Sequence, residues 1–405
     1  MNTAKLTNYH IFITFLKLGC IGFGGPAAHL VLFHNILIKK MRWLDEAQYY
    51  QILALAQILP GPTSSQVGIS IGYLKNGYLG AFCAWLGFTL PSALLMASSA
   101  LFGQYIFNTL NNIFFHIIQL IVLSVVIWAF WQMLTTLCHQ LWQYVLLIFS
   151  AVFIYTVSMA MNQFIVIFIA ALVGGFLAKE QHQKEIFLKD SEAKLTIINI
   201  KNSKAYIWLF IFIVPFFCFP LFNHFSPSVL IQSIEGFYQS ASLVFGGGHV
   251  ILPLLHQEFV STGLISNDKF DLGYALVQFV PGPLFSFSSY LGALLPLTSS
   301  VTLNIIIASF IIFVPSFFLI FGTFPYWSWL MKQKIIYKSL QGINAAVVGL
   351  LLCLIYQMSE KYIIQSTDII FVVILIFLLR MKFPVWLVLL STFFIYYFYL
   401  NHYIM

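Results

Sequence analysis

The chain has 405 residues, of which 60% are hydrophobic and only 8% carry a formal charge. Soluble domains usually carry about a quarter charged residues, so this composition excludes a soluble globular protein. The net charge of +7 gives no support to nucleic-acid binding, because lysine and arginine also gather beside membrane segments. Two stretches, 76–178 and 272–331, contain no Asp, Glu, Lys or Arg, and stretches of that length predict several membrane crossings.

The first apolar segment, 9–38, is interrupted by GFGGP at Gly22 to Pro26. Lys17 breaks its first run and no small-residue cleavage site follows, which does not fit a cleavable signal peptide. A charge at membrane depth is expensive, so Lys17 is a candidate for contacting an anion; alternatively, its long side chain reaches the interface. His29, three residues after Pro26, is a candidate anion donor or proton relay, or else a packing residue.

The second broken segment, 44–74, contains ALAQILPGP. Proline removes an amide donor and glycine permits tight bends, so Pro60-Gly61-Pro62 predicts that one half-helix ends and another begins. The new half-helix would start with free N–H groups and a partial positive charge, which bind anions. Four side chains that can donate hydrogen bonds follow at Thr63, Ser64, Ser65 and Gln66. Arg42, just before the segment, either attracts an anion or anchors the chain at the interface.

Lysine and arginine also decide how segment 44–74 enters the membrane. A full crossing would place Lys39, Lys40 and Arg42 outside, although positive residues normally stay in the cytoplasm. A re-entrant hairpin keeps them inside and therefore fits the charge pattern better, with a discontinuous crossing as the alternative.

Nine unbroken membrane spans are predicted, at about 78–100, 113–137, 141–158, 161–177, 206–223, 299–322, 341–358, 367–380 and 384–400. Residues 179–204 carry six lysines and four acids, and we predict that they form a cytoplasmic linker between two halves. With that linker inside, the basic residues around 332–338 and 380–382 also fall inside.

The second half repeats the first. Phe23-Gly24-Gly25 recurs 222 residues later as Phe245-Gly246-Gly247, and ALVQFVPGP at 275–283 repeats the earlier nonapeptide 221 residues on. The extra span 206–223 makes the second half start on the opposite side of the membrane. We therefore predict an all-α polytopic membrane protein of two inverted-topology repeats, each with two Gly/Pro-broken segments and about four spans. The predicted domains are an N-terminal repeat (1–178), a linker (179–205), and a linking helix with the inverted C-terminal repeat (206–405).

The four breaks predict a transport site, because non-helical backbone at membrane depth is tolerated where it is buried in protein or lines a wet cavity. The alternative is that they only kink or pack helices. The candidate substrate-binding residues are Gly24, Gly25, Pro26, His29, Pro60, Gly61, Pro62, Thr63, Ser64, Ser65, Gln66, Gly247, Gly248, His249, Pro281, Gly282 and Pro283. The candidate charge or proton-relay residues are Lys17, Arg42 and Glu235.

Other chemistry finds little support. The sequence has no GxxxxGK[ST] phosphate loop and no HExxH zinc motif, and its five cysteines lack metal-binding spacing. We therefore predict no catalytic residues, no metal and no cofactor. A membrane enzyme or a scaffold remains a weaker alternative to a carrier.

Six stretches together resemble the chromate ion transporter family in its long two-domain form. They are FLKLGCIGFGGPAAHL (15–30), WLDEAQYYQILALAQILPGPTSSQ (43–66), IGYLKNGYLGAFCAWLGFTLPS (71–92), LVFGGGHVILPLL (243–255), ALVQFVPGPLFSFSSYLG (275–292) and GINAAVVGLL (342–351). The resemblance covers about 10–360. It implies a multi-pass carrier of the bacterial inner membrane that exports chromate, is driven by the proton gradient, and has sulfate as a competitor.

The alternatives within this class are a carrier of sulfate or of another small anion. The expected partners are a tetrahedral oxyanion, protons and the lipid bilayer, with no nucleic acid. A homodimer is compatible with such a carrier.

Overall fold

The computed structural model describes residues 6–106, 112–157, 162–178, 204–330, 332–381, 383 and 385–403, and these residues form helices and loops without a strand. In hydrocarbon each backbone N–H and C=O must be paired within the protein, and an α-helix pairs them inside one segment. Among the described residues, six helical segments are long and apolar enough to cross a membrane. The prediction of an all-α polytopic membrane protein is confirmed. The predicted linker lies outside the described residues except for Lys204 and Ala205, so the domain boundaries stay a prediction.

The first half contains α1 (Asn8–Ile21), α2 (Gly25–Phe33), the π-helix η1 (His34–Lys40), α3 (Glu46–Ile58), α4 (Thr63–Ile106), α5 (Asn112–Leu137), α6 (Leu141–Thr156) and α7 (Asn162–Leu177). The second half begins with α9 (Tyr206–Ile213), α10 (Pro215–Phe225), α11 (Val229–Ser242), η2 (Gly248–Val250), α12 (Ile251–Phe259), α13 (Asn267–Val277), η3 (Leu284–Ser286) and α14 (Phe287–Leu294). It continues with α15 (Val301–Ile311), α16 (Val314–Thr323), η4 (Phe324–Tyr326), α17 (Trp327–Leu330), α18 (Lys334–Tyr362), α19 (Ser366–Arg380) and α20 (Val385–Tyr403). Each of the nine predicted spans coincides with one of these helices or with two consecutive ones.

Helix α4 is in fact two helices joined by a sharp reversal. Asn76 and Gly77 have non-helical backbone angles, with φ values of −153° and 62°. The helices on either side touch, because a Cβ atom on Gly72 would lie 2.3 Å from the carbonyl oxygen of Gly80. Residues 63–75 therefore run antiparallel to the helix that begins after Gly77. They bring the chain to the end of the molecule at which that helix starts.

Segment 44–74 has the geometry of the predicted hairpin. At its start, the rings of Trp43 and His10 lie 5.8 Å apart. At its end, the Nδ2 atom of Asn76 donates a hydrogen bond of 2.7 Å to Oδ1 of Asn8. Both ends thus lie beside the first residues of α1, so the segment enters and leaves on one side.

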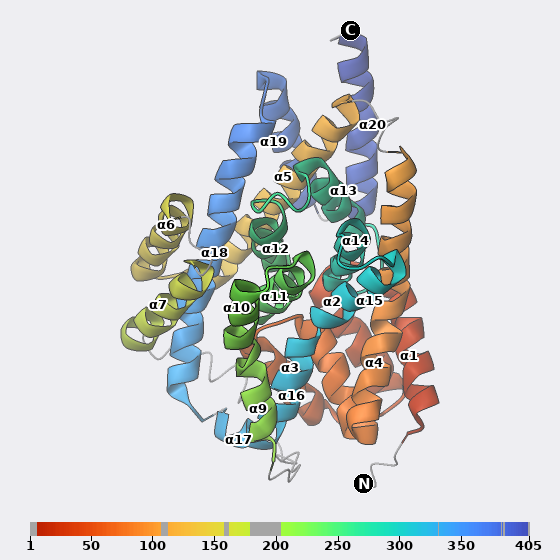
Figure 1. Cartoon of the computed structure of the whole chain (residues 1–405), viewed down its shortest axis with the longest axis vertical. Coiled ribbons are helices and arrows are strands. Elements are labelled where there is room, and N and C mark those ends of the chain that lie inside the picture. Colours follow the sequence, from red (N-terminus) through yellow and green to blue (C-terminus); the bar gives the residue numbers. More distant parts are fainter. Residues whose placement is uncertain are drawn as a thin grey trace.

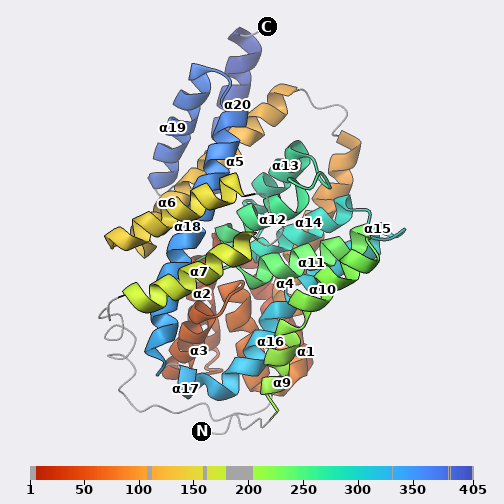
Figure 2. The ribbon, with the colours of Figure 1, turned by 60° about the vertical axis from the view of Figure 1, so that its left-hand side comes forward.

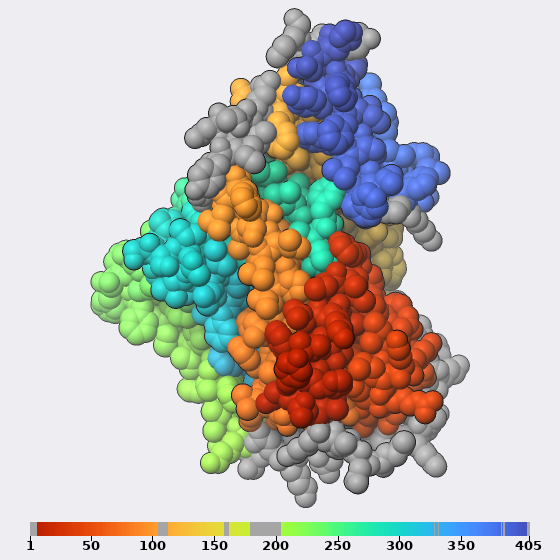
Figure 3. Space-filling view, turned by 90° about the vertical axis from the view of Figure 1, so that its right-hand side faces the viewer, coloured from red at the N-terminus to blue at the C-terminus, as the bar shows by residue number. Residues whose placement is uncertain are grey.

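The hairpins of the two halves open toward opposite ends. The Trp208 ring, three residues after the linker, lies 5.6 Å from the ring of Tyr78, which places the first-half openings at the linker end. Helix α18 starts at that same end, because Lys338 packs against Gly174 of α7. Its 29 residues extend about 43 Å to Tyr362, whose hydroxyl lies 3.3 Å from Asn267 at the start of α13. The second-half hairpins therefore open at the far end, with α12 to α14 above α1 to α3 in Figure 1, and Figure 3 shows blue-green atoms of the second half above the red N-terminal helices.

Two helices of each half also pack against a long helix of the other half. Helices α6 and α7 pack on α18, whereas α19 and α20 pack on α5, as Figure 2 shows. Glycines allow the closest of these contacts: a Cβ atom on Gly342 of α18 would lie 2.0 Å from the carbonyl oxygen of Ala170 in α7. Small residues of this kind let membrane helices approach backbone to backbone.

Two adjacent glycines of α7 give a matched test of this packing. A Cβ atom on Gly174 would lie 2.6 Å from the Lys338 carbonyl oxygen, whereas on Gly175 it would meet the end of the flexible Ile335 side chain at 3.1 Å. We expect Gly174→Ala to destabilise the protein by about 1–3 kcal/mol through overpacking. Gly175→Ala should stay within about 0.5 kcal/mol of the original chain. Thermal unfolding in detergent measures both, and equal stabilities would contradict the predicted contact.

Candidate functional site

The four breaks of the two halves meet at one place, here called the junction (22–26, 59–66, 244–249 and 280–286). The backbone N–H of Gly61 donates a hydrogen bond of 2.8 Å to the carbonyl oxygen of Val244. The N–H of Gly282 donates one of 2.7 Å to the carbonyl oxygen of Gly22. In each case the glycine of Pro-Gly-Pro in one half reaches the residue before Phe-Gly-Gly in the other. The two bonds are equivalent under the repeat.

A second pair of equivalent contacts fixes the same two glycines. A Cβ atom on Gly61 would lie 2.8 Å from the Oγ of Ser316, and one on Gly282 would lie 2.7 Å from the Oγ of Ser92. The φ angles of 123° at Gly61 and 109° at Gly282 are left-handed, which only glycine adopts without strain. The Pro-Gly-Pro sequences therefore do more than break a helix, because their glycines permit the closest approach between the halves.

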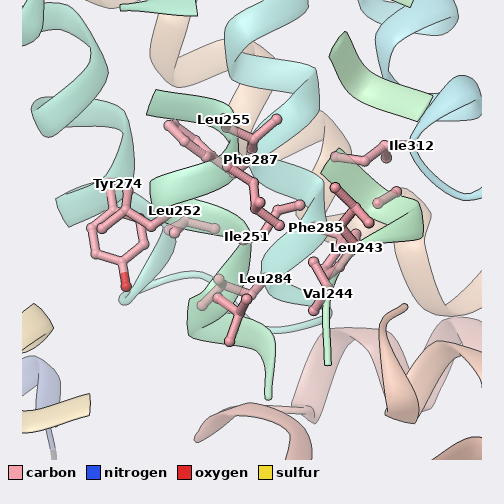
Figure 4. Close-up of a cluster of buried hydrophobic side chains, with 14 of the residues drawn as sticks. Leu243, Val244, Ile251, Leu252, Leu255, Tyr274, Leu284, Phe285, Phe287 and Ile312 are labelled. Carbon is pink, nitrogen blue, oxygen red and sulfur yellow. The ribbon is translucent and has the colours of Figure 1, made fainter. Parts of the chain in front are cut away.

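An apolar cluster holds the second-half side of the junction in place. Figure 4 shows Val244, Ile251, Leu284 and Phe285 gathered around the two breaks, and all four are buried. Side chains packed at this density leave the backbone little freedom. The second half thus supplies much of the rigid wall, and the polar side chains concentrate in the first half.

The first turn of α4 presents the predicted polar residues to the junction. Ser64, Ser65 and Gln66 are buried. Gln66 uses its Nε2 atom to donate a hydrogen bond of 2.6 Å to the carbonyl oxygen of Pro60. The hydroxyl of Ser65 has no hydrogen-bond partner in the structure. Because an unpaired buried hydroxyl is costly, Ser65 is the side chain best suited to donate to a ligand.

Sequence reasoning missed a matching serine in the second half. Ser286 lies 221 residues after Ser65, is 1% exposed, and its hydroxyl also lacks a partner. It stands between Phe285 and Phe287, so the stretch looked apolar, although the spacing of the repeat would have identified it. Two equivalent serines thus follow the two Pro-Gly-Pro turns with free hydroxyl groups.

His29 is fully buried and both of its ring nitrogens are engaged. Its Nε2 atom lies 2.9 Å from the carbonyl oxygen of Gly22, which can only accept, so Nε2 carries the hydrogen. Its Nδ1 atom then accepts from the hydroxyl of Ser64 at 3.3 Å. In this state neither His29 nor Ser64 has a donor to offer a ligand. Together they hold the carbonyl group of Gly22, which also accepts the hydrogen bond from the N–H of Gly282.

His249 follows the second-half break much as His29 follows the first-half break, but the two are not equivalent under the repeat. In the sequence repeat, the position equivalent to His29 is Ile251, and the position equivalent to His249 is Ala27. His249 lies in η2, where its Nδ1 atom is 2.9 Å from the hydroxyl of Tyr274. The two histidines therefore hold different parts of the junction.

The remaining candidates lie in different surroundings. Thr63 is half-buried at the start of α4, and Gly24, Gly25, Pro26 and Gly247 are half-buried or exposed at the first-half and second-half bends. Gly248 is buried, and a Cβ atom on it would meet Pro26 at 3.4 Å, which brings these two bends together. The side chains of Lys17 and Arg42 are exposed, and Glu235 lies on α11, where Gln239 donates to its carboxylate at 2.9 Å. The structure thus brings the four breaks together, but not the three predicted charges.

The chain matches the family model described as "Chromate transporter" twice, over 9–175 and over 231–397. An uncharacterized transporter of Methanocaldococcus jannaschii is 27% identical over 84% of this chain and 82% of its own length. A probable chromate transport protein of Synechococcus elongatus is 26% identical over 85% and 81%, and a chromate transport protein of Pseudomonas aeruginosa is 24% identical over 84% and 78%. No solved structure matches the chain.

Proposed function

Because the chain belongs to the chromate transporter family, we propose that it is a secondary carrier that exports chromate across a bacterial plasma membrane. The proposed driving force is the proton gradient, and the proposed mechanism is alternating access around the junction. The single observation that carries this proposal is the pair of unpartnered buried serines, Ser65 and Ser286, where the broken helices of both halves meet.

The chemistry of the junction favours an oxyanion. A dianion that leaves water loses its hydration and needs several donors in return. The hydroxyls of Ser65 and Ser286 and the free N–H groups in the first turns of α2 and α4 are donors of this kind. None of these groups is a negatively charged acceptor, which would repel chromate.

Sulfate is the second candidate substrate. Hydroxyl and amide donors recognise the oxygens of a tetrahedral dianion rather than its central atom, and chromate and sulfate share that shape. A difference in affinity between chromate and sulfate would therefore come from small differences in pocket size. Competition between the two anions for transport is the appropriate test.

Alternating access would follow from the inverted repeat. In the present state Gly61 and Gly282 each hold the opposite half by one backbone hydrogen bond. We propose that the halves rock about these contacts, so that the junction meets the linker side and the opposite side in turn. Such motion requires no new kind of contact, because the contacts that each half makes with the other are equivalent.

Chromate flux into inverted membrane vesicles tests this function. We expect accumulation of labelled chromate when the vesicle lumen is acidic, loss of that accumulation with a protonophore, and inhibition by excess sulfate. Vesicles that lack the protein provide the control. If vesicles with folded protein took up no more chromate than the control, the substrate would be wrong, whereas flux that ignored the protonophore would contradict proton coupling.

A further inference from the structure

A polar cavity of about 550 Å³ lies apart from the junction, between α6, α7, α10, α11, α12 and α18. Several residues that line it lie at the ends of helices farthest from the linker, namely Ile154, Tyr155, Val157, Asn162, Gln163, Pro220, Asn223, Ser261 and Thr262. The cavity therefore lies on the side toward which the second-half hairpins open. Glu235 and Glu258 both line it, together with His256 and several amide side chains.

Two carboxylates share this cavity at close range. Glu258 of α12 lies against the backbone of α11, because a Cβ atom on Gly236 would be 3.3 Å from its Oε2 atom. Gly236 is the residue next to Glu235. Two carboxylates held near one another in a partly enclosed site disfavour double ionisation, so the pair tends to retain a proton. The other titratable side chains that line the cavity are Tyr155 of α6 and Cys353 of α18.

A third acid lies behind the cavity and is connected to it by side chains. His256 lines the cavity, and its Nε2 atom is 3.4 Å from Oδ1 of Asn267. The hydroxyl of Tyr362 lies 3.3 Å from that same Oδ1 atom and donates a hydrogen bond of 2.6 Å to Oδ2 of Asp271. We call this set the outer acidic network (Glu235, Glu258, His256, Asn267, Asp271 and Tyr362).

Asp271 provides the independent sign that the network binds a ligand. It is only 1% exposed, and its Oδ1 atom has no hydrogen-bond partner. A buried carboxylate oxygen without a hydrogen-bond donor is strongly unfavourable. A bound proton neutralises the carboxylate and gives the unpaired oxygen a hydrogen. The charged groups that interact with Asp271 from neighbouring positions are Asp268 and Lys361, of opposite sign, and the hydroxyl of Tyr290 is also near.

We infer that the outer acidic network is the site at which protons from the far side of the membrane load the carrier. Glu235 and Glu258 take up protons in the open cavity, and Asp271 holds one on the half-helix that leads to Pro281-Gly282-Pro283. Because α13 ends at Val277, four residues before this turn, a change of charge on Asp271 acts on the element that leads to the contact with the first half. The inference rests on the proposed proton-coupled function.

Three variants in proteoliposomes test the network. Asp271→Asn keeps the acceptor for Tyr362 but cannot bind an exchangeable proton, and Glu258→Gln does the same in the cavity. Glu360→Gln, on the exposed face of α18, is the matched control. We expect the first two to lower chromate accumulation driven by a pH gradient by about tenfold or more, with Glu360→Gln unchanged. Chromate-for-chromate exchange without a gradient should continue in all three, because exchange requires no net proton movement.

Two results would overturn the inference. One is gradient-driven accumulation at the original level in both Asp271→Asn and Glu258→Gln. The other is an equal loss of exchange and accumulation in both, which would assign the residues to substrate binding or to folding.

Infrared difference spectra between acid and alkaline pH separate this inference from the proposed function. They report a protonated carboxyl group without any substrate. If the original protein moved no chromate, the function would be wrong, but loss of a carboxylic-acid band in Asp271→Asn would still support the proton site. Identical spectra for Asp271→Asn and the original chain would overturn it.

Discussion

Replacing Gly61 by leucine is expected to abolish chromate transport while the protein still reaches the membrane. Gly61 has a φ angle of 123°, and a Cβ atom there would lie 2.6 Å from Nε2 of Gln66 and 2.8 Å from Oγ of Ser316. The strain of such a backbone costs about 1–3 kcal/mol and the overpacking about as much again. These costs fall at the junction, where a shift of about 1 Å in a positioned group can lower a rate by about 100-fold.

The equivalent change, Gly282→Leu, extends the same prediction to the second half. Its Cβ atom would lie 2.7 Å from Oγ of Ser92, and the bond to the Gly22 carbonyl would be displaced. Gly263→Ala is the matched control, since Gly263 also has a positive φ, of 78°, but has nothing within 4 Å. The amount of each variant in the membrane fraction and its chromate flux are measured together. Normal flux in both leucine variants would show that the junction is not the transport site.

The charge pattern of the sequence was sufficient to predict much of this fold. Lys39, Lys40 and Arg42 would lie on the wrong side if 44–74 crossed the membrane, and the structure has a hairpin there. The identical nonapeptide positions likewise predict two halves, and the extra span before α11 predicts their opposite orientation. Both inferences use constraints that the bilayer imposes on any sequence, namely the cost of unpaired backbone and the side preference of basic residues.

The contacts between the halves could not be predicted in this way. A repeat identifies Gly61 with Gly282 as equivalent positions, but equivalence does not indicate that Gly61 meets Val244 or that Gly282 meets Gly22. Those contacts arise from how two folded halves pack. Helix α4 shows a similar limit, because the reversal at Gly77 depends on the small residues at 72 and 80 that let its two parts touch.

The charged residues show where hydropathy alone gives little information about position. Lys17 interrupts an apolar run and therefore stood out, yet its side chain is exposed. Asp271 and Glu258 lie near the ends of the second-half apolar segments 267–296 and 228–260, and no role was predicted for them. Asp271 is nevertheless buried, because its side chain points into the protein, where it accepts a hydrogen bond from the hydroxyl of Tyr362.

The two unpartnered serines yield the sharpest test of substrate binding. If the hydroxyls of Ser65 and Ser286 donate to the anion, Ser65→Ala and Ser286→Ala should each remove one hydrogen bond to a charged group. Such a bond contributes about 1.5–3 kcal/mol, so each variant should raise the KM for chromate by about 10- to 100-fold. Alanine leaves no unpaired hydroxyl in the protein, and the folded chain should be at least as stable as before.

The double variant then shows whether the serines act on one substrate. Two donors that bind the same anion share its charge, so their combined effect should differ from the sum of the single effects by at least about 0.5 kcal/mol. Ser288→Ala is the control, because Ser288 is also buried and unpartnered but lies two residues farther along the chain, in α14. Flux measured over a range of chromate concentrations gives the KM of each variant. If the two single variants had the KM of the control, the anion would bind elsewhere, and the helix N-termini alone could not define the site.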